Sequence, residues 1–165
     1  MNDEKRKTYF GKYRGIVTDN RDPQKKGRLK ARVPSLRGDN ESTWALPCVP
    51  YAGDRVGWFM MPPEDASVWI EFENGDWDSP IWSGCFWDQD DEPPASDPDT
   101  KMIKTNGVTI TIDDSQSSGA ITIETGDGVK IVMDSNGIEI NNGQDATIKL
   151  SGPSVKINDD ALEVM

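Results

Sequence analysis

Short alternating runs of apolar and polar residues fill the C-terminal part of the chain and constrain its fold more than any other feature. The stretch GDGVKIVMDSNGIEINNG at 126–143 shows the pattern, with each run followed by a glycine-containing turn. Alternation with a period of two is typical of a strand that buries one face. Residues 101–165 are therefore expected to form a succession of strands, each of about three to five residues.

Each of these runs contributes two or three apolar side chains to one face. The runs recur at intervals of mostly about seven to ten residues, and Gly and Asn mark the corners, as in a β-solenoid or β-prism. Such narrow sheets are marginal alone, so the apolar face needs a cover. Three copies around a threefold axis would turn that face inward and the polar residues outward. The expected trimer core comprises Val108, Ile110, Ile112, Ile121, Ile123, Val129, Ile131, Met133, Ile138, Ile140, Ile148, Leu150, Val155 and Ile157, and the expected tip comprises Leu162, Val164 and Met165.

Residues 9–87 have a different character, because they hold all six tryptophans of the chain. Strand-like runs separated by Pro- and Gly-containing turns predict a small five-stranded Greek-key barrel. Residues 1–8 precede it as a tail. The runs are 13–20, 28–36, 43–50, 55–62, 67–72 and 80–87, and the tryptophans are Trp44, Trp58, Trp69, Trp77, Trp82 and Trp87.

The segment between the two regions is acidic and rich in proline. Residues 88–100, DQDDEPPASDPDT, carry six acidic residues, three Pro and no Lys or Arg. This composition cannot build a core, which predicts an extended linker and a domain boundary.

Charge is distributed unevenly along the chain. Residues 1–38 hold 12 Lys and Arg against 4 Asp and Glu, while residues 39–165 hold 6 against 25. Phosphate would be repelled by most of the surface, so nucleic acid is not an expected partner. The basic N-terminal part fits either an acidic protein partner or a solvated strand edge protected by lysines.

The start, MNDEKRKTYF, has no apolar stretch of the kind found in signal peptides, and no run is long enough for a membrane span. We therefore expect synthesis in the cytoplasm without a signal peptide. The two cysteines, Cys48 and Cys85, fit buried thiols better than a disulfide framework.

The residues of the chain offer few candidates for a catalytic site. The chain has no histidine, which excludes Ser-His-Asp and Cys-His arrangements. Two carboxylate pairs, Glu71 with Glu73 and Asp76 with Asp78, have the spacing for a shared face, but solvated strand and turn acids are the favoured interpretation. Asp127, Asp134 and Asn136 match no known calcium-loop spacing. We expect no enzyme activity, no catalytic residue, no metal and no cofactor.

The tryptophans leave a binding function open. Small Greek-key barrels bind oligosaccharides or single-stranded nucleic acid on aromatic platforms, whereas core or interface packing explains the same residues structurally. Packing is favoured, because most of the tryptophans stand beside β-branched or aromatic neighbours and the chain after residue 38 is acidic. A binding module for polysaccharide or single-stranded nucleic acid is the alternative function, and a hydrolase is a third class.

Four segments carry a resemblance to a known family: GRLKARVPSL (27–36), ESTWALPCVPYAG (41–53), GWFMMPPEDASVWIEFENGDWDSPIWSG (57–84) and CFW (85–87). They resemble the OB-fold domain of the central spike proteins of contractile tails, which include the phage baseplate assembly protein V, gp5-like and VgrG proteins. The region 101–165 is similar to the intertwined trimeric β-helix that follows the OB domain in those spikes.

The resemblance implies a homotrimeric structural spike of a phage tail or injection-system baseplate. Its OB domains would cap the tail-tube hub protein, and the spike would pierce the target cell envelope when the sheath contracts. A small PAAR-like tip protein is expected at the C-terminus. The short linker leaves no room for the lysozyme domain of some relatives, and the absence of histidine removes the iron-binding His-x-His tip of others.

Overall fold

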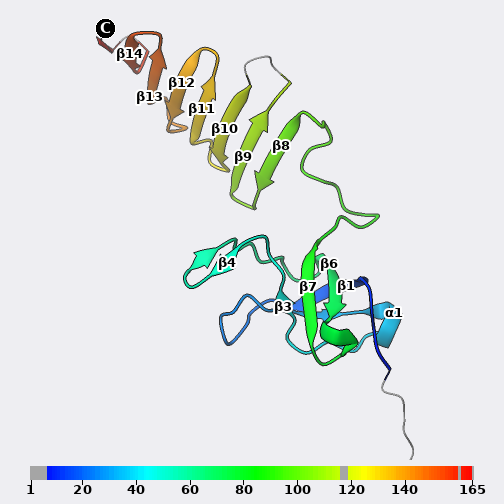
Figure 1. The fold of residues 1–165 in the computed structure, drawn as a ribbon. Coiled ribbons are helices and arrows are strands. Elements are labelled where there is room, and N and C mark those ends of the chain that lie inside the picture. Colours follow the sequence, from blue (N-terminus) through cyan, green and yellow to red (C-terminus); the bar gives the residue numbers. More distant parts are fainter. Residues whose placement is uncertain (1–6, 116–118, 160, 165) are drawn as a thin grey trace, which may run out of the picture. The chain divides into compact units, whose positions relative to one another are not determined.

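The computed structural model describes residues 7–115, 119–159 and 161–164 (Figure 1). The chain divides into two compact units between Asp91 and Glu92. The regular secondary structure of both units is almost all β, which confirms the predicted all-β class. The helices of the described residues are a single α-helical turn and a single 3-10 turn.

The first unit is a curled five-stranded sheet with the order β2-β1-β6-β7-β3. Its two ends meet through an antiparallel bridge between Leu29 and Ala45, in which each backbone N–H donates to the other residue's carbonyl, at 3.2 and 2.7 Å. The sheet therefore closes into the small barrel that the sequence predicts. Its strands are β1 (Tyr13–Asp19), β2 (Lys30–Arg32), β3 (Leu46–Pro47), β6 (Ser67–Phe72) and β7 (Pro80–Cys85).

The barrel interior is built from the inward positions of these alternating strands. Its aliphatic side chains are fully buried, and an aromatic group closes one end, where the rings of Phe72 and Trp77 stack at 5.1 Å. Such packing makes the barrel the hydrophobic core of the first unit. The core comprises Tyr9, Val17, Leu29, Ala31, Val33, Ala45, Val68, Ile70, Phe72, Trp77 and Trp82.

Three expected strands of the first unit differ from the prediction. The run 28–36 ends early because a helical turn, α1 (Pro34–Arg37), begins with a proline whose fixed φ favours the first helical position. The run 43–50 keeps only the two residues of β3 as strand. The run 55–62 folds back on 51–53 as a hairpin of β4 (Ala52–Gly53) and β5 (Val56–Gly57), and a 3-10 turn, η1 (Glu73–Gly75), follows β6.

One expectation about burial in the first unit also needs correction. Cys48 and Cys85 are free, as expected, but both are exposed rather than buried. Among the tryptophans, Trp77 and Trp82 belong to the core, whereas Trp58 is 51% exposed and Trp87 is 62% exposed. The aromatic content therefore does not all serve the core.

The second unit is one antiparallel sheet of eight strands in sequence order (Figure 1). Each strand pairs with the next through a short turn, which is the meander expected of the alternating runs. One strand, β8, was not expected from the pattern. The strands are β8 (Thr100–Lys104), β9 (Val108–Asp113), β10 (Ala120–Thr125), β11 (Lys130–Asp134), β12 (Gly137–Asn141), β13 (Thr147–Ser151), β14 (Ser154–Ile157) and β15 (Leu162–Val164).

In the single chain, β9 to β14 have both edges occupied by neighbours from the same chain. The intertwined trimeric β-helix that the resemblance implies, in which strands from three chains would interlock, stays a prediction.

Candidate functional site

The most prominent surface of the second unit is the apolar face of its sheet. Cross-strand partners such as Ile131 and Ile140, or Ile140 and Ile148, stand directly opposite each other on neighbouring strands. Their repetition builds two parallel apolar columns from β9 to β14. One column comprises Ile112, Ile121, Met133, Ile138, Leu150 and Val155, and the other comprises Ile110, Ile123, Ile131, Ile140, Ile148 and Ile157.

These side chains remain substantially exposed in the single chain. Eleven of the twelve are 36–43% exposed, and Ile110 is half-buried. Full burial of such a side chain is worth about 1.5–3 kcal/mol, so covering the rest would add roughly 0.6–1.2 kcal/mol for each one. Twelve of them amount to an upper estimate on the order of 10 kcal/mol per chain. A stable domain needs a second layer, and the second unit contains only one.

The opposite face of the sheet is largely polar. Thr111, Thr122, Glu139 and Lys149 occupy its central positions, and Met102 and Val132 are apolar residues on the same face. The Nζ of Lys149 forms an ion pair with Asp159 at 2.9 Å. The two faces therefore differ sharply in solvation, as expected of a sheet that has one side in water.

Turns at the strand ends keep this register. Asn136 N–H donates to the Asp134 carboxylate at 2.7 Å, and Gly143 N–H donates to the side-chain oxygen of Asn141 at 2.7 Å. Gly137 has φ +132°, and a Cβ there would lie 1.8 Å from the carbonyl oxygen of Leu150. A one-residue slip would exchange the two faces, so these turns hold the apolar columns together.

The remaining predicted core and tip residues lie around the two columns. Val108 and Val129 are 41% and 43% exposed beside the turn that joins β10 to β11. Leu162 is 53% exposed and pairs with Ile157, and Val164 pairs with Val155 in the backbone register. Met165 lies outside the described residues.

The first unit exposes a second apolar surface, which we call the aromatic arm and define as residues 51–60. The arm contains the β4–β5 hairpin, in which Trp58 N–H donates to the Tyr51 carbonyl at 2.8 Å. A Cβ at Gly57 would lie 2.8 Å from the same carbonyl oxygen, so the hairpin requires glycine there. Its large apolar side chains are Tyr51, Val56, Trp58, Phe59 and Met60, which are 60, 54, 51, 78 and 48% exposed.

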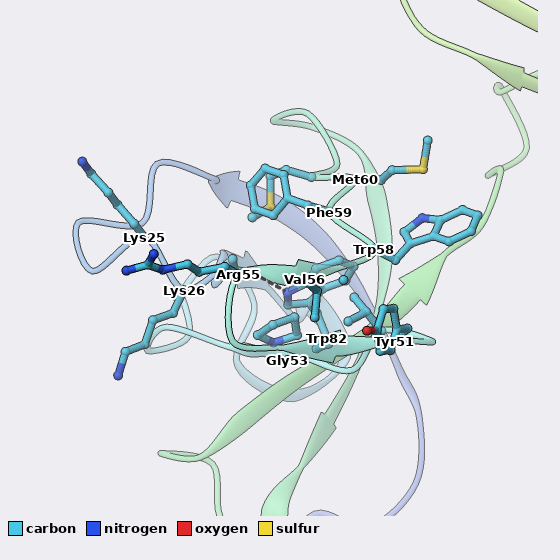
Figure 2. Close-up of a pocket in the computed structure, with 16 residues that line it drawn as sticks. Lys25, Lys26, Tyr51, Gly53, Arg55, Val56, Trp58, Phe59, Met60 and Trp82 are labelled. Carbon is cyan, nitrogen blue, oxygen red and sulfur yellow. Dashed lines mark hydrogen bonds between the residues drawn. The ribbon is translucent and has the colours of Figure 1, made fainter.

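The arm encloses an open cavity of about 420 Å³ against the barrel wall. Trp82, which donates its indole N–H to the Gly27 carbonyl at 3.1 Å, forms part of that wall. Figure 2 shows the cationic side chains of Lys25, Lys26 and Arg55 on one side of the view, with Tyr51 and Trp58 on the other. The cavity therefore combines an aromatic lining with a basic rim.

A buried carboxylate orders the loop that carries the two lysines. Asp22, with its side chain 3% exposed, accepts from the Arg28 guanidinium at 2.6 Å and from the backbone N–H of Gln24 and Lys26 at 2.9 and 2.7 Å. The Arg28 hydrogen bond, helped by the backbone donors, holds the pKa of Asp22 well below its usual range. Lys25 and Lys26 are exposed, and within the described part of the chain neither forms an ion pair.

The carboxylates considered for catalysis take part in contacts within the first unit. Glu71 forms an ion pair with Lys12 at 3.1 Å, and Glu73 begins the 3-10 turn after β6. Asp78 N–H donates to the Asp76 carboxylate at 3.2 Å within the following turn. In the described residues there is no group of three or more His, Cys, Asp or Glu suited to a metal ion. No helix of this part has the length and apolarity to cross a membrane.

Comparison with protein families matches both units separately and in order. Residues 13–87 match the injector OB domain of type VI secretion systems and phage baseplates. Residues 101–163 match the C-terminal trimerisation domain of phage baseplate V. The chain belongs to the phage baseplate V family. Both matched domains of this family member are structural baseplate domains, and its apolar sheet lies within the trimerisation domain. No curated protein matches the chain.

The aromatic arm was not found by the sequence reasoning, which placed a barrel strand at 55–62. A signal was present in YAGDRVGWFMM, where a turn-forming Gly-Asp-Arg stands between two short runs. The same residues include three aromatic side chains, and they do not alternate with polar residues in the way expected of a strand that buries one face.

Proposed function

We propose that the chain is the central spike of a contractile tail or injection-system baseplate, assembled as a homotrimer. The observation that carries the proposal is the apolar face of the second unit, which a single chain leaves uncovered within a trimerisation domain. Three such sheets, each presenting its two apolar columns to a common axis, would bury the predicted core. This arrangement uses faces rather than strand edges, because the edges of β9 to β14 are already paired.

A prism of this kind has the mechanical properties of a piercing device. Each sheet is continuous from β8 to β15, so an axial load is shared by successive antiparallel ladders. The polar outer faces keep the prism in solution. We propose that sheath contraction drives this spike through the target envelope, and that a small separate tip protein caps the β15 end.

The OB units would join the spike to the tail-tube hub. In this unit the basic residues gather early in the sequence, and between residues 39 and 87 Arg55 stands alone against nine Asp and Glu. Charged side chains on the surface of this unit would orient its docking on a charged protein surface. We propose that charge complementarity between the OB units and the tail-tube hub positions the trimer in the assembled particle.

The test is to purify the particles that contain this chain and to image them by electron microscopy. The proposal predicts threefold density on the tail axis below the tube, and particles from an Ile140→Asp strain should lack this density and fail to injure target cells. A strain carrying Thr122→Asp, on the polar face, is the matched control and should assemble normally. Full injury by particles without the chain would contradict the proposal.

A further inference from the structure

We propose that the aromatic arm of each OB unit docks on the OB unit of a neighbouring copy, so that the three barrels form a head-to-tail ring. This inference rests on the proposed function, because the contact requires the trimer. It extends the proposed function by assigning a partner to the arm and its basic rim, namely the OB unit of a neighbouring copy.

The size of the arm surface argues for a tethered partner. Aromatic side chains bury about 150–250 Å² each, so Tyr51, Trp58 and Phe59 at 51–78% exposure offer on the order of 400 Å², to which Val56 and Met60 add a smaller area. A standard interface buries about 800 Å² on each partner, which is more than these side chains offer together. The arm is therefore too small to hold a separate protein firmly by itself. It is large enough for a partner whose local concentration is already high.

A second copy of the chain meets that condition. The trimerisation domain holds three chains together, and 12 residues, 88–99, separate Trp87 from β8. A segment of this length reaches at most about 40 Å when fully extended. Short tethers of this kind give effective concentrations in the millimolar range, at which a weak contact becomes well populated.

Charge complementarity selects the surface on the neighbour. The rim of the cavity presents Lys25, Lys26 and Arg55, and none of them forms an ion pair within the described residues. The same unit carries an acidic turn at Glu64–Asp65. The backbone N–H of Asp65 donates to the Val17 carbonyl at 3.0 Å, so this turn packs beside the end of β1.

The carboxylates of the acidic turn could form ion pairs with the cations of the rim. Neither Glu64 nor Asp65 has an ion-pair partner in the described part of the molecule. Each barrel thus carries, within the described residues, cations without an ion pair on the rim of the arm and carboxylates without an ion pair on the turn. A heterologous contact between the rim of one copy and the turn of the next closes into a ring when the rotation is threefold.

Site-specific photo-crosslinking of the purified full-length protein tests the contact. A photoreactive benzoylphenylalanine replaces Phe59, the most exposed residue of the arm, and in a control protein it replaces Ser35 on α1. We expect covalent dimers and trimers from position 59, with cross-linked peptides from residues 13–20 or 62–66 of a neighbouring copy. Position 35 should give few of these products.

Charge reversal provides the second measurement. Arg55→Glu should lower the cross-linking yield about two- to fivefold, the range of an exposed ion pair, and adding Glu64→Lys should restore it. Equal yields from positions 59 and 35 in a protein that sediments as a trimer would overturn the inference and leave the proposed function standing. Cross-links from position 59 to a tail protein or glycan instead of a second copy would overturn it too. A protein that sediments as a monomer would contradict the proposed function itself.

Discussion

Placing one carboxylate on the apolar face of the second unit should dissociate the assembly. Ile140 lies in the middle of that face, 40% exposed, between Ile131 and Ile148 on the neighbouring strands. Covering the rest of this side chain is worth about 1 kcal/mol per chain. Ile140→Asp loses that term and adds a penalty of several kcal/mol for each buried unpaired carboxylate.

Over three chains the penalty is on the order of 10 kcal/mol, or about seven powers of ten in the association constant. Sedimentation velocity at micromolar concentration should therefore report a monomer for Ile140→Asp at neutral pH. Burial and mutual repulsion would raise the pKa of the three carboxylates in the trimer, so assembly should recover as the pH falls toward the usual aspartate value of about 4.

Thr122→Asp is the matched control, because the same residue is introduced on the opposite face. Thr122 stands between Thr111 and Val132, so the new carboxylate meets no like charge directly across the ladder. This variant should sediment as the wild-type protein does. The reasoning would be refuted by a stable Ile140→Asp trimer, or by equal dissociation of the two variants.

Three further substitutions test the folded units. Leu29→Ala removes a fully buried barrel side chain and should cost about 2–5 kcal/mol in urea unfolding while leaving the sedimentation coefficient unchanged; an unaltered midpoint would contradict the assigned core. Asp22→Asn should lower the thermal midpoint at neutral pH. Because the pKa of Asp22 is lowered in the folded protein, the ionised carboxylate stabilises the fold above about pH 4, and this stabilisation is lost as the pH falls further. A difference between the two thermal midpoints that is the same at all pH values would contradict this role of Asp22. Gly137→Ala places a Cβ against the Leu150 carbonyl, so it should lower the free energy of unfolding by about 1–3 kcal/mol and speed amide exchange in β12. Gly107→Ala is the control, because its Cβ would enter open space and should have neither effect. Equal amide exchange in the two variants would show that residue 137 does not require glycine.

The second unit was predictable because alternation records burial directly. Every run with a strict period of two became a strand, and its apolar residues fell on one face. The run TKMIK of β8 lacks that period, since Lys101 occupies the position opposite Ile112 in an apolar column. A charged residue at that position concealed the strand.

Other features were harder to predict from the residues. The strands of the aromatic arm, β4 and β5, are only two residues long and pair with each other, so they are too short to show a period of two. The helical turn at Pro34 depended on backbone geometry instead of hydrophobic pattern. The pairing of β9 to β14 within one chain depended on the short turns, which make neighbouring strands the nearest partners.

The central claim is that three copies of this chain cover one another's apolar sheet faces. Native mass spectrometry of the purified full-length protein tests it most directly. The account predicts a dominant species at three times the 18.3 kDa chain mass, which Ile140→Asp converts to the single-chain mass. A wild-type protein that stays at the single-chain mass at micromolar concentration would contradict the account.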